Sequence, residues 1–198
     1  MHDVLTGEAR IRDVVVATED GVDLVPATIE LARVEMALLT RGAREHTLDD
    51  ALGDLRSHYD WVILDCPPTL GILTINALTA ADEVIVPLQC ETLAHRGVGQ
   101  LVETVRDVAR VTNPRLTISG ILPTMYDGRT SHARAVLADI VERYDVPVLD
   151  PPIARSVRFA EAPALGRSAL STARHLRGVE AYRVHAQRMV DSRRAESS

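Results

Sequence analysis

The chain has 198 residues, of which 46% are hydrophobic and 25% charged, so it can bury a core and is not a disordered chain. Aromatic residues make up only 3%, so the core must consist of aliphatic side chains, as is usual where helices cover a parallel sheet. The net charge of −6 is uneven, because residues 1–150 hold 13 arginines and 24 acids, whereas 151–198 hold 9 arginines and 4 acids. Any surface that binds a polyanion is therefore expected towards the C-terminus.

The sequence contains no lysine, so all 22 of its Lys and Arg residues are arginine. Two cysteines, Cys66 and Cys90, and the lack of an early basic run followed by an apolar one indicate a reducing cytosolic environment without a disulfide framework. The most apolar stretch, 70–88, is interrupted by polar residues that are costly at the centre of a bilayer, and we therefore predict no membrane span.

Apolar periodicity and turn residues predict short strands that alternate with longer helices, without an internal repeat. In chain order the predicted elements are a helix closed by Gly7, a strand at 22–25 stopped by Pro26, a helix at 47–55 capped by Thr47, a buried strand at 61–64, a helix at 70–80, a strand at 84–88, a helix at 98–111, a strand at 118–122, a helix at 134–144, and helices at 157–165 and 179–190. This alternation predicts an α/β fold with a mostly parallel sheet flanked by helices, in a single domain over 1–190 followed by a polar tail at 191–198. In such sheets ligands bind beyond the carboxyl ends of the strands.

The segment 59–68, YDWVILDCPP, places a carboxylate at the end of a predicted apolar strand, where two prolines stop the backbone ladder. In nucleotide hydrolases an Asp in this position holds Mg²⁺ directly or through water. The pattern by itself has two explanations, because an Asp that only closes a turn gives the same residues.

The longer run YDWVILDCPPTLGILTINALTAADEVIVPLQCE, residues 59–91, closely resembles the Walker B and switch II block of the ParA/Soj partition ATPases, which are relatives of MinD. The later TMYDGRT, ARSVRFAEAPALGR and GVEAY, and the early MHDVLTGEA and LVPATIELA, resemble segments of that family in the same order. The likeness spans nearly the whole chain, and a collinear series of this length is specific.

The resemblance implies a cytoplasmic, nucleoid-associated partition ATPase whose full form binds ATP and Mg²⁺, forms a homodimer, binds DNA without sequence preference and is stimulated by a ParB-type protein. Asp65 matches the magnesium-associated Asp of the family, and the switch that senses the terminal phosphate begins at Pro67 and ends at Asn76. The positions that resemble segments near the adenine base are Thr124, Met125, Tyr126, Ile153 and Arg155. No residue of the chain is assigned a catalytic role.

Arg129 and Arg158, with Arg155 nearby, match positions that form a sequence-independent DNA-binding surface in the family. Guanidinium groups suit phosphate oxygens, and phosphate contacts supply affinity without sequence preference. One monomer offers few such contacts, so useful affinity requires a dimer or polymer. The alternative explanation is that these residues are ordinary solvated surface arginines.

The glycine-rich phosphate-binding loop, its two lysines and the switch I Asp of the family are not found in this sequence. The resemblance places that loop and its strand before Met1, so we expect an incomplete sheet, no ATP hydrolysis and no tight binding of ATP or Mg²⁺ by the chain as given. A start assigned too late, a shortened chain and a true loss of the loop are all consistent with this pattern.

Two other functions are consistent with the same residues. The first is a non-catalytic DNA-binding or dimerising module that keeps the scaffold without the chemistry. The second is a MinD-like ATPase of division-site placement, which would need a C-terminal amphipathic helix for the membrane. The stripe Val179, Tyr182, Ala186, Met189 and Val190 is modest, and we expect it to pack on the protein's own core.

Overall fold

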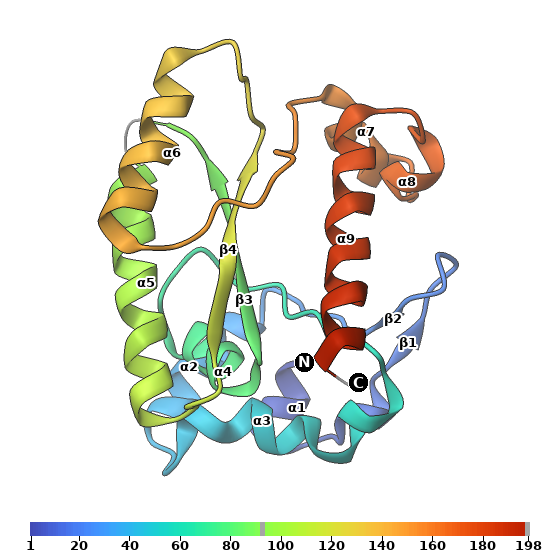
Figure 1. The fold of residues 1–198 in the computed structure, drawn as a ribbon. Coiled ribbons are helices and arrows are strands. Elements are labelled where there is room, and N and C mark those ends of the chain that lie inside the picture. The colour runs from blue at the N-terminus through green and yellow to red at the C-terminus, as the bar shows by residue number, and fades with distance from the viewer. Residues whose placement is uncertain (92–93, 197–198) are drawn as a thin grey trace. The chain divides into compact units, whose positions relative to one another are not determined.

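Residues 1–91 and 94–196 are described by a computed structural model of the chain (Figure 1). Contacts divide the chain into two units, one formed by Met1–Val84 with Glu103–Thr117 and the other by Ile85–Val102 with Ile118–Ser198. The strand β3 (Glu83–Gln89) and the helix α5 (Ala94–Val111) contribute residues to both.

The first unit is mainly helical. Its elements are α1 (His2–Thr6), the 3₁₀ helix η1 (Ile11–Asp13), β1 (Val16–Ala17), β2 (Asp23–Leu24), α2 (Leu31–Leu39), η2 (Arg44–His46), α3 (Thr47–Leu52), η3 (Gly53–His58) and α4 (Ile72–Ala80). Gly7 ends α1 in the left-handed conformation, with φ of 85°, as the sequence predicts. The predicted strand at 22–25 is present as β2, which pairs antiparallel with β1.

The core of the first unit lies against one face of α2. Val34 and Leu38, four residues apart on that face, are 0% and 1% exposed. They belong to one apolar cluster whose other buried members are Val4, Leu5, Ile11, Leu48, Leu52, Ala77 and Ala80. The cluster therefore joins α1, α2, α3 and α4.

The second unit contains the larger sheet fragment and the C-terminal helices. Besides its parts of β3 and α5, it holds β4 (Thr117–Thr124) from Ile118 onward, α6 (Ser131–Tyr144), α7 (Val157–Ala164), α8 (Ala169–Thr172) and α9 (Arg177–Glu196). The strands β3 and β4 are hydrogen-bonded neighbours, run in the same direction and are connected through α5 (Figure 1). On β4, parallel bridges pair Ile121 with Val148 and Tyr126 with Ala154.

Gly120 explains how β4 accepts the segment 147–149. A Cβ atom at Gly120 would lie 2.8 Å from Leu149 Cδ2 and 2.9 Å from the Pro147 carbonyl oxygen, and its φ is +153°. The close approach lets Ile121 donate to Pro147 O and accept from Leu149 N, both at 2.8 Å. The second unit thus has parallel pairing on β4 as the sequence predicts.

The predicted buried strand at 61–64 is wrong. Residues 61–67 carry no helix or strand, and Trp61 and Ile63 are 40% and 85% exposed. A strand needs a neighbour for its backbone hydrogen bonds, and among the described residues no strand pairs with this segment. The α/β class is confirmed, but the sheet consists of two-stranded fragments and isolated bridges.

The described helices include none that is long and apolar enough to cross a membrane. The last of them, α9, passes through the start of the predicted polar tail and ends at Glu196, and residues 197–198 lie outside the described part. Thr47 opens α3, but its hydroxyl donates to Arg44 O at 3.1 Å and does not cap the helix.

Candidate functional site

Asp65 lies in the extended segment between η3 and α4, in the first unit, with its side chain open to solvent. The adjacent Cys66 thiol donates to Leu64 O at 3.6 Å. Desolvation of the thiol and the negative charge of Asp65 raise the pKa of Cys66. The Asp65 carboxylate is therefore accessible and lies next to Cys66, and accessibility is what a ligand for an incoming cation requires.

The predicted switch, which begins at Pro67, leads into α4. Gly71 precedes the first residue of α4, and Thr74 Oγ1 donates to Thr69 O at 2.6 Å across the turn. A Cβ at Gly71 would lie 2.7 Å from Glu35 Oε1, so the α2 side chain of Glu35 covers the start of α4. A carboxylate at this end of a helix is favoured by the exposed backbone N–H groups.

Asn76, the last residue of the predicted switch, is a buried amide with every group in use. Its Oδ1 accepts from Leu48 N at 3.0 Å, and its Nδ2 donates to Arg44 O and to Ile72 O, each at 2.9 Å. The side chain is 1% exposed. It ties α4 to the turn between η2 and α3.

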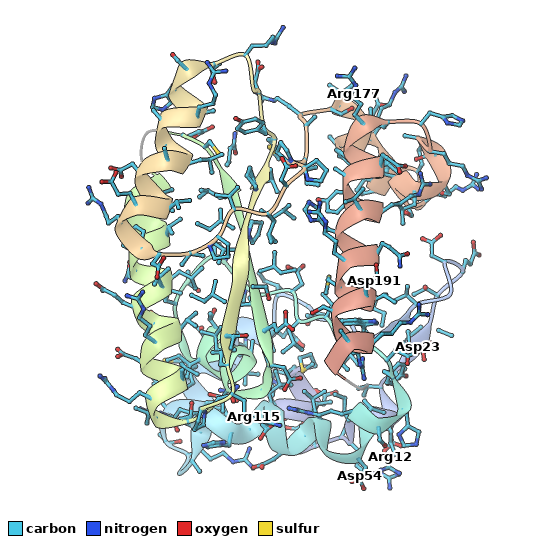
Figure 2. The ribbon with its side chains drawn as sticks, in the orientation of Figure 1. Arg12, Asp23, Asp54, Arg115, Arg177 and Asp191 are labelled. Atoms are coloured by element: carbon cyan, nitrogen blue, oxygen red, sulfur yellow. The ribbon has the colours of Figure 1, made fainter. Side chains whose placement is uncertain are left out.

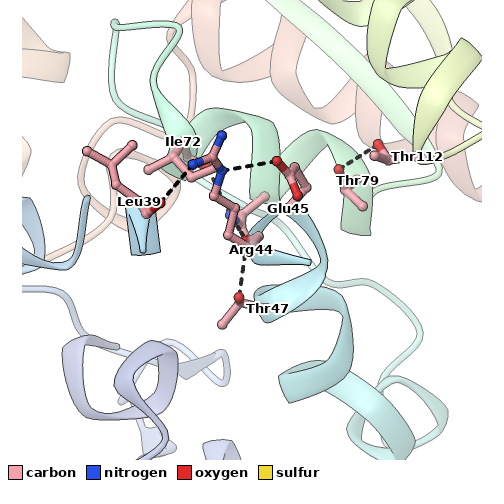
Figure 3. Close-up of polar contacts among 8 residues, drawn as sticks. Leu39, Arg44, Glu45, Thr47, Ile72, Thr79 and Thr112 are labelled. Atoms are coloured by element: carbon pink, nitrogen blue, oxygen red, sulfur yellow. Dashed lines mark hydrogen bonds and ion pairs between the residues drawn. The ribbon is translucent and has the colours of Figure 1, made fainter. Parts of the chain in front are cut away.

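Arg44 is the centre of that turn, and the sequence did not single it out. Figure 3 shows its guanidinium bonded to Leu39 O at 2.9 Å and to Glu45 Oε1 at 3.2 Å, while its carbonyl accepts from Thr47 Oγ1. The backbone N–H of Glu45, and after it Arg44, hold the pKa of the Glu45 carboxyl below its ordinary value. The turn is a structural network that supports α4.

The segments predicted to approach an adenine base lie in the second unit, where main-chain hydrogen bonds bring them together. Tyr126 N donates to Ile153 O at 2.9 Å, Ile153 N donates to Pro123 O at 2.8 Å, and Arg155 N donates to Tyr126 O at 3.4 Å. Met125 has a φ of 48°, which is uncommon for a residue with a side chain. Thr124, Met125 and Tyr126 thus lie beside Ile153 and Arg155, whose role stays a prediction.

Arg129 is held in a tight turn between β4 and α6. Its Nε donates to Asp127 Oδ1 at 2.9 Å, its Nη2 to Asp127 Oδ2 at 2.8 Å, and its backbone N to Asp127 Oδ1 at 3.1 Å. Thr130 bonds back to Asp127 O and accepts from Ala133 N as the cap of α6. The hydrogen bonds from Arg129, with its charge, lower the pKa of Asp127 to about 2.

Arg155 and Arg158 lie at the start of α7. Ser156 caps this helix by accepting from Arg158 N at 3.3 Å, and Arg158 Nη1 donates to Glu161 Oε2 at 2.8 Å. Within the described residues the Arg155 guanidinium makes no ion pair. The helix α9 begins with a further arginine, Arg177. Its later part carries Asp191 (Figure 2).

The donor set of Asp65 decides which metal chemistry is possible. In residues 1–91 and 94–196 no three His, Cys, Asp or Glu side chains lie together in a way that could hold a metal ion. Magnesium bound with a nucleotide takes one or two carboxylates and fills its remaining positions with water and phosphate oxygens. Asp65 therefore fits a magnesium ion carried by a nucleotide, and it does not fit a metal held by protein ligands alone.

Sequence reasoning missed Asp127 and Glu161, which are the acidic partners of the predicted DNA-binding residues Arg129 and Arg158. Both could have been found from local spacing. Asp127 stands two residues before Arg129 in a turn, and Glu161 stands three residues after Arg158 on a helix, where side chains face each other.

Comparison with known proteins gives consistent matches over nearly the whole chain. A family model described as an AAA domain matches residues 1–118. The chromosome partitioning protein ParA of Caulobacter vibrioides is 42% identical over 197 residues, which cover 98% of this chain and 74% of that protein. The sporulation initiation inhibitor protein Soj of Bacillus subtilis is 41% identical over 183 residues, which cover 92% of this chain and 72% of that protein.

A solved structure extends the comparison to three dimensions. The crystal structure named as cobyrinic acid a,c-diamide synthase from Mycobacterium smegmatis, with bound ADP and magnesium, is 48% identical and superposes with a TM-score of 0.83. The match covers 96% of this chain and 70% of that one. A relative with the same fold thus binds a magnesium nucleotide.

Proposed function

This chain belongs to the ParA/Soj family of partition ATPases, and from that premise we propose that it acts in chromosome or plasmid segregation by binding DNA without sequence preference as a nucleotide-dependent homodimer. It would work in the cytoplasm on the nucleoid, with a ParB-type protein as the partner that stimulates release.

The observation that carries the proposal is the parallel bridge between Tyr126 and Ala154. Because the two bridged segments run in the same direction, the residues that follow each of them leave at the same edge. Arg129 follows the first segment, and Arg155 and Arg158 follow the second. The three arginines therefore follow backbone segments that end at the same edge, which supports a shared phosphate-binding surface.

By the family resemblance, Asp65 would bind the magnesium ion or its water shell, and Pro67 would begin the segment that responds to the terminal phosphate. The base of a bound nucleotide would lie near Thr124, Met125, Tyr126, Ile153 and Arg155. When bound, magnesium neutralises charge on the phosphates.

A MinD-like membrane cycle is less well supported by α9. Val179 and Ala181 are buried within their unit, and His185 Nε2 lies 2.7 Å from Pro151 O. Tyr182 packs edge-on against Phe159, with ring centroids 5.8 Å apart. Of the stripe itself, Val179 is buried and Tyr182 contacts Phe159 while 43% exposed, whereas Ala186 is exposed and Met189 and Val190 are half-buried, so the expected packing on the core is present only in the first part of the helix.

Salt-titrated binding to a random-sequence DNA duplex tests the proposed function. Because each phosphate contact contributes about 0.9 to the slope of log K against log salt, the Arg129→Ala/Arg158→Ala variant should have a slope flatter by about 1.8. Arg110→Ala is the matched control, since Arg110 is an exposed arginine paired with Asp107 at 2.8 Å on α5. Equal slopes for the native chain and the double variant would show the arginine assignment to be wrong.

A further inference from the structure

Two of the three arginines matched to the DNA-binding surface, Arg129 and Arg158, are already bonded to an acidic side chain. Arg129 meets Asp127 through two guanidinium hydrogen bonds, at 2.8 and 2.9 Å. Arg158 meets Glu161 through one, at 2.8 Å. Both acids occupy guanidinium N–H groups that a phosphate oxygen would use.

The Asp127 pair is the stronger of the two and is still open to solvent. The Arg129 side chain is 90% exposed and that of Asp127 is 42% exposed. The carboxylate engages Nε and Nη2, so the guanidinium edge that carries Nη1 stays outward. An anion can therefore reach Arg129, but it approaches beside a negative charge.

Protonation cannot remove this charge under physiological conditions, because the pKa of Asp127 is about 2. The turn around it is also fixed independently of the ion pair. Thr130 Oγ1 donates to Asp127 O at 3.0 Å, and Arg134 Nη1 donates to Gly128 O at 2.9 Å. Asp127 is thus a permanent negative charge in a preformed turn.

We propose that Asp127 is an internal competitor for Arg129 that holds the affinity of the chain for DNA phosphates below the value the arginine alone would give. This inference rests on the proposed DNA-binding function. A surface that must release DNA gains from such a competitor, because the carboxylate takes the guanidinium back when the phosphate leaves. Exposed ion pairs of this kind shift equilibria by about twofold to fivefold.

Asp127→Asn is the test variant, since the amide keeps the Oδ1 acceptor for Arg129 N and removes both the charge and the Oδ2 acceptor that Arg129 Nη2 uses. We expect it to bind a random-sequence duplex about twofold to fivefold more tightly than the native chain, measured by fluorescence anisotropy between about 50 and 200 mM NaCl. Glu161→Gln should have the smaller effect, because Glu161 makes one hydrogen bond to its arginine and Asp127 makes two.

Asp107→Asn is the matched control. It changes the net charge by the same amount in an exposed Asp–Arg pair of the same length, Asp107 with Arg110 at 2.8 Å, outside the second unit. An effect of overall charge alone would appear equally in Asp107→Asn and Asp127→Asn. We expect the gain only in Asp127→Asn.

A double-mutant cycle with Arg129→Ala separates competition from a positioning role. A competitor makes the loss on Arg129→Ala larger in the Asp127→Asn background, whereas an aspartate that orients the arginine makes it smaller. If Arg129→Ala weakens binding and Asp127→Asn binds no better than Asp107→Asn, the competitor is disproved and the DNA-binding function stands. If Arg129→Ala binds like the native chain, Arg129 makes no phosphate contact and the competitor is disproved, whereas a native chain that does not bind the duplex at all would disprove the proposed function.

Discussion

Asn76 makes three hydrogen bonds inside the first unit, so its substitution should destabilise this unit strongly. Asn76→Ala would leave the buried Leu48 N–H, and the carbonyls of Arg44 and Ile72, without this partner. Because each buried group left unsatisfied costs about 1–3 kcal/mol, we expect the free energy of unfolding to fall by about 3 kcal/mol in urea titrations. Gln187→Ala removes an exposed amide that donates to Asp191 Oδ1 at 2.9 Å, and it should change stability by less than about 0.5 kcal/mol. Similar losses in the two variants would contradict the network.

The pKa of the Asp127 carboxyl is clearly shifted and can be measured directly. Its pKa of about 2 lies below the ordinary value of 3.8, so the folded state favours the ionised form. The ion pair therefore stabilises the folded state fully above the ordinary pKa, and this stabilisation is lost as the pH falls through the folded pKa. The pair causes no change in the free energy of unfolding between about pH 5 and 8. Carboxyl NMR titration should show the low pKa in the native chain and a return towards 3.8 in Arg129→Ala. An unchanged pKa in that variant would exclude the ion pair in solution.

Gly120 allows the segment 147–149 to pack closely against β4. Gly120→Ala should push the segment 147–149 away from β4 and cost about 1–3 kcal/mol, because the new methyl group meets Leu149 and the Pro147 carbonyl. Gly97→Ala in α5 is the control, since nothing lies within 4 Å of its added Cβ, and alanine should stabilise this helix by up to about 1 kcal/mol. Thermal unfolding of both variants gives the comparison, and a neutral Gly120→Ala would contradict the close contact.

The sequence was most informative about elements whose signals are local. The predicted helix at 134–144 is present as α6, and the strand at 118–122 as β4, because periodicity and turn residues act within a few positions. The prediction of a strand at 61–64 is wrong. An apolar run indicates that a segment can be buried, but it does not say whether another strand is available to pair with it. The helix α2 was missed, although Leu31, Val34 and Leu38 have helical spacing.

In the candidate site, too, the sequence predicted single residues but not the contacts between residues far apart in the chain. Family resemblance predicted the roles of Asp65, of the arginines and of the segment around Tyr126, which a parallel bridge joins to Ala154. The resemblance could not give the contacts of Asn76 with Leu48 and Arg44, because residues about 30 positions apart meet there. Those contacts depend on the packing of the whole unit.

The whole molecule has one composition feature that bears directly on catalysis. The 198 residues contain no lysine and no phosphate-binding loop, while phosphoryl transfer in this family depends on positioning and neutralising the phosphates. We expect these residues by themselves to show no magnesium-dependent ATP hydrolysis in a phosphate-release assay, although Asp65 is available for a metal. A family member that carries the loop is the positive control. Turnover that disappears in Asp65→Ala would contradict this expectation.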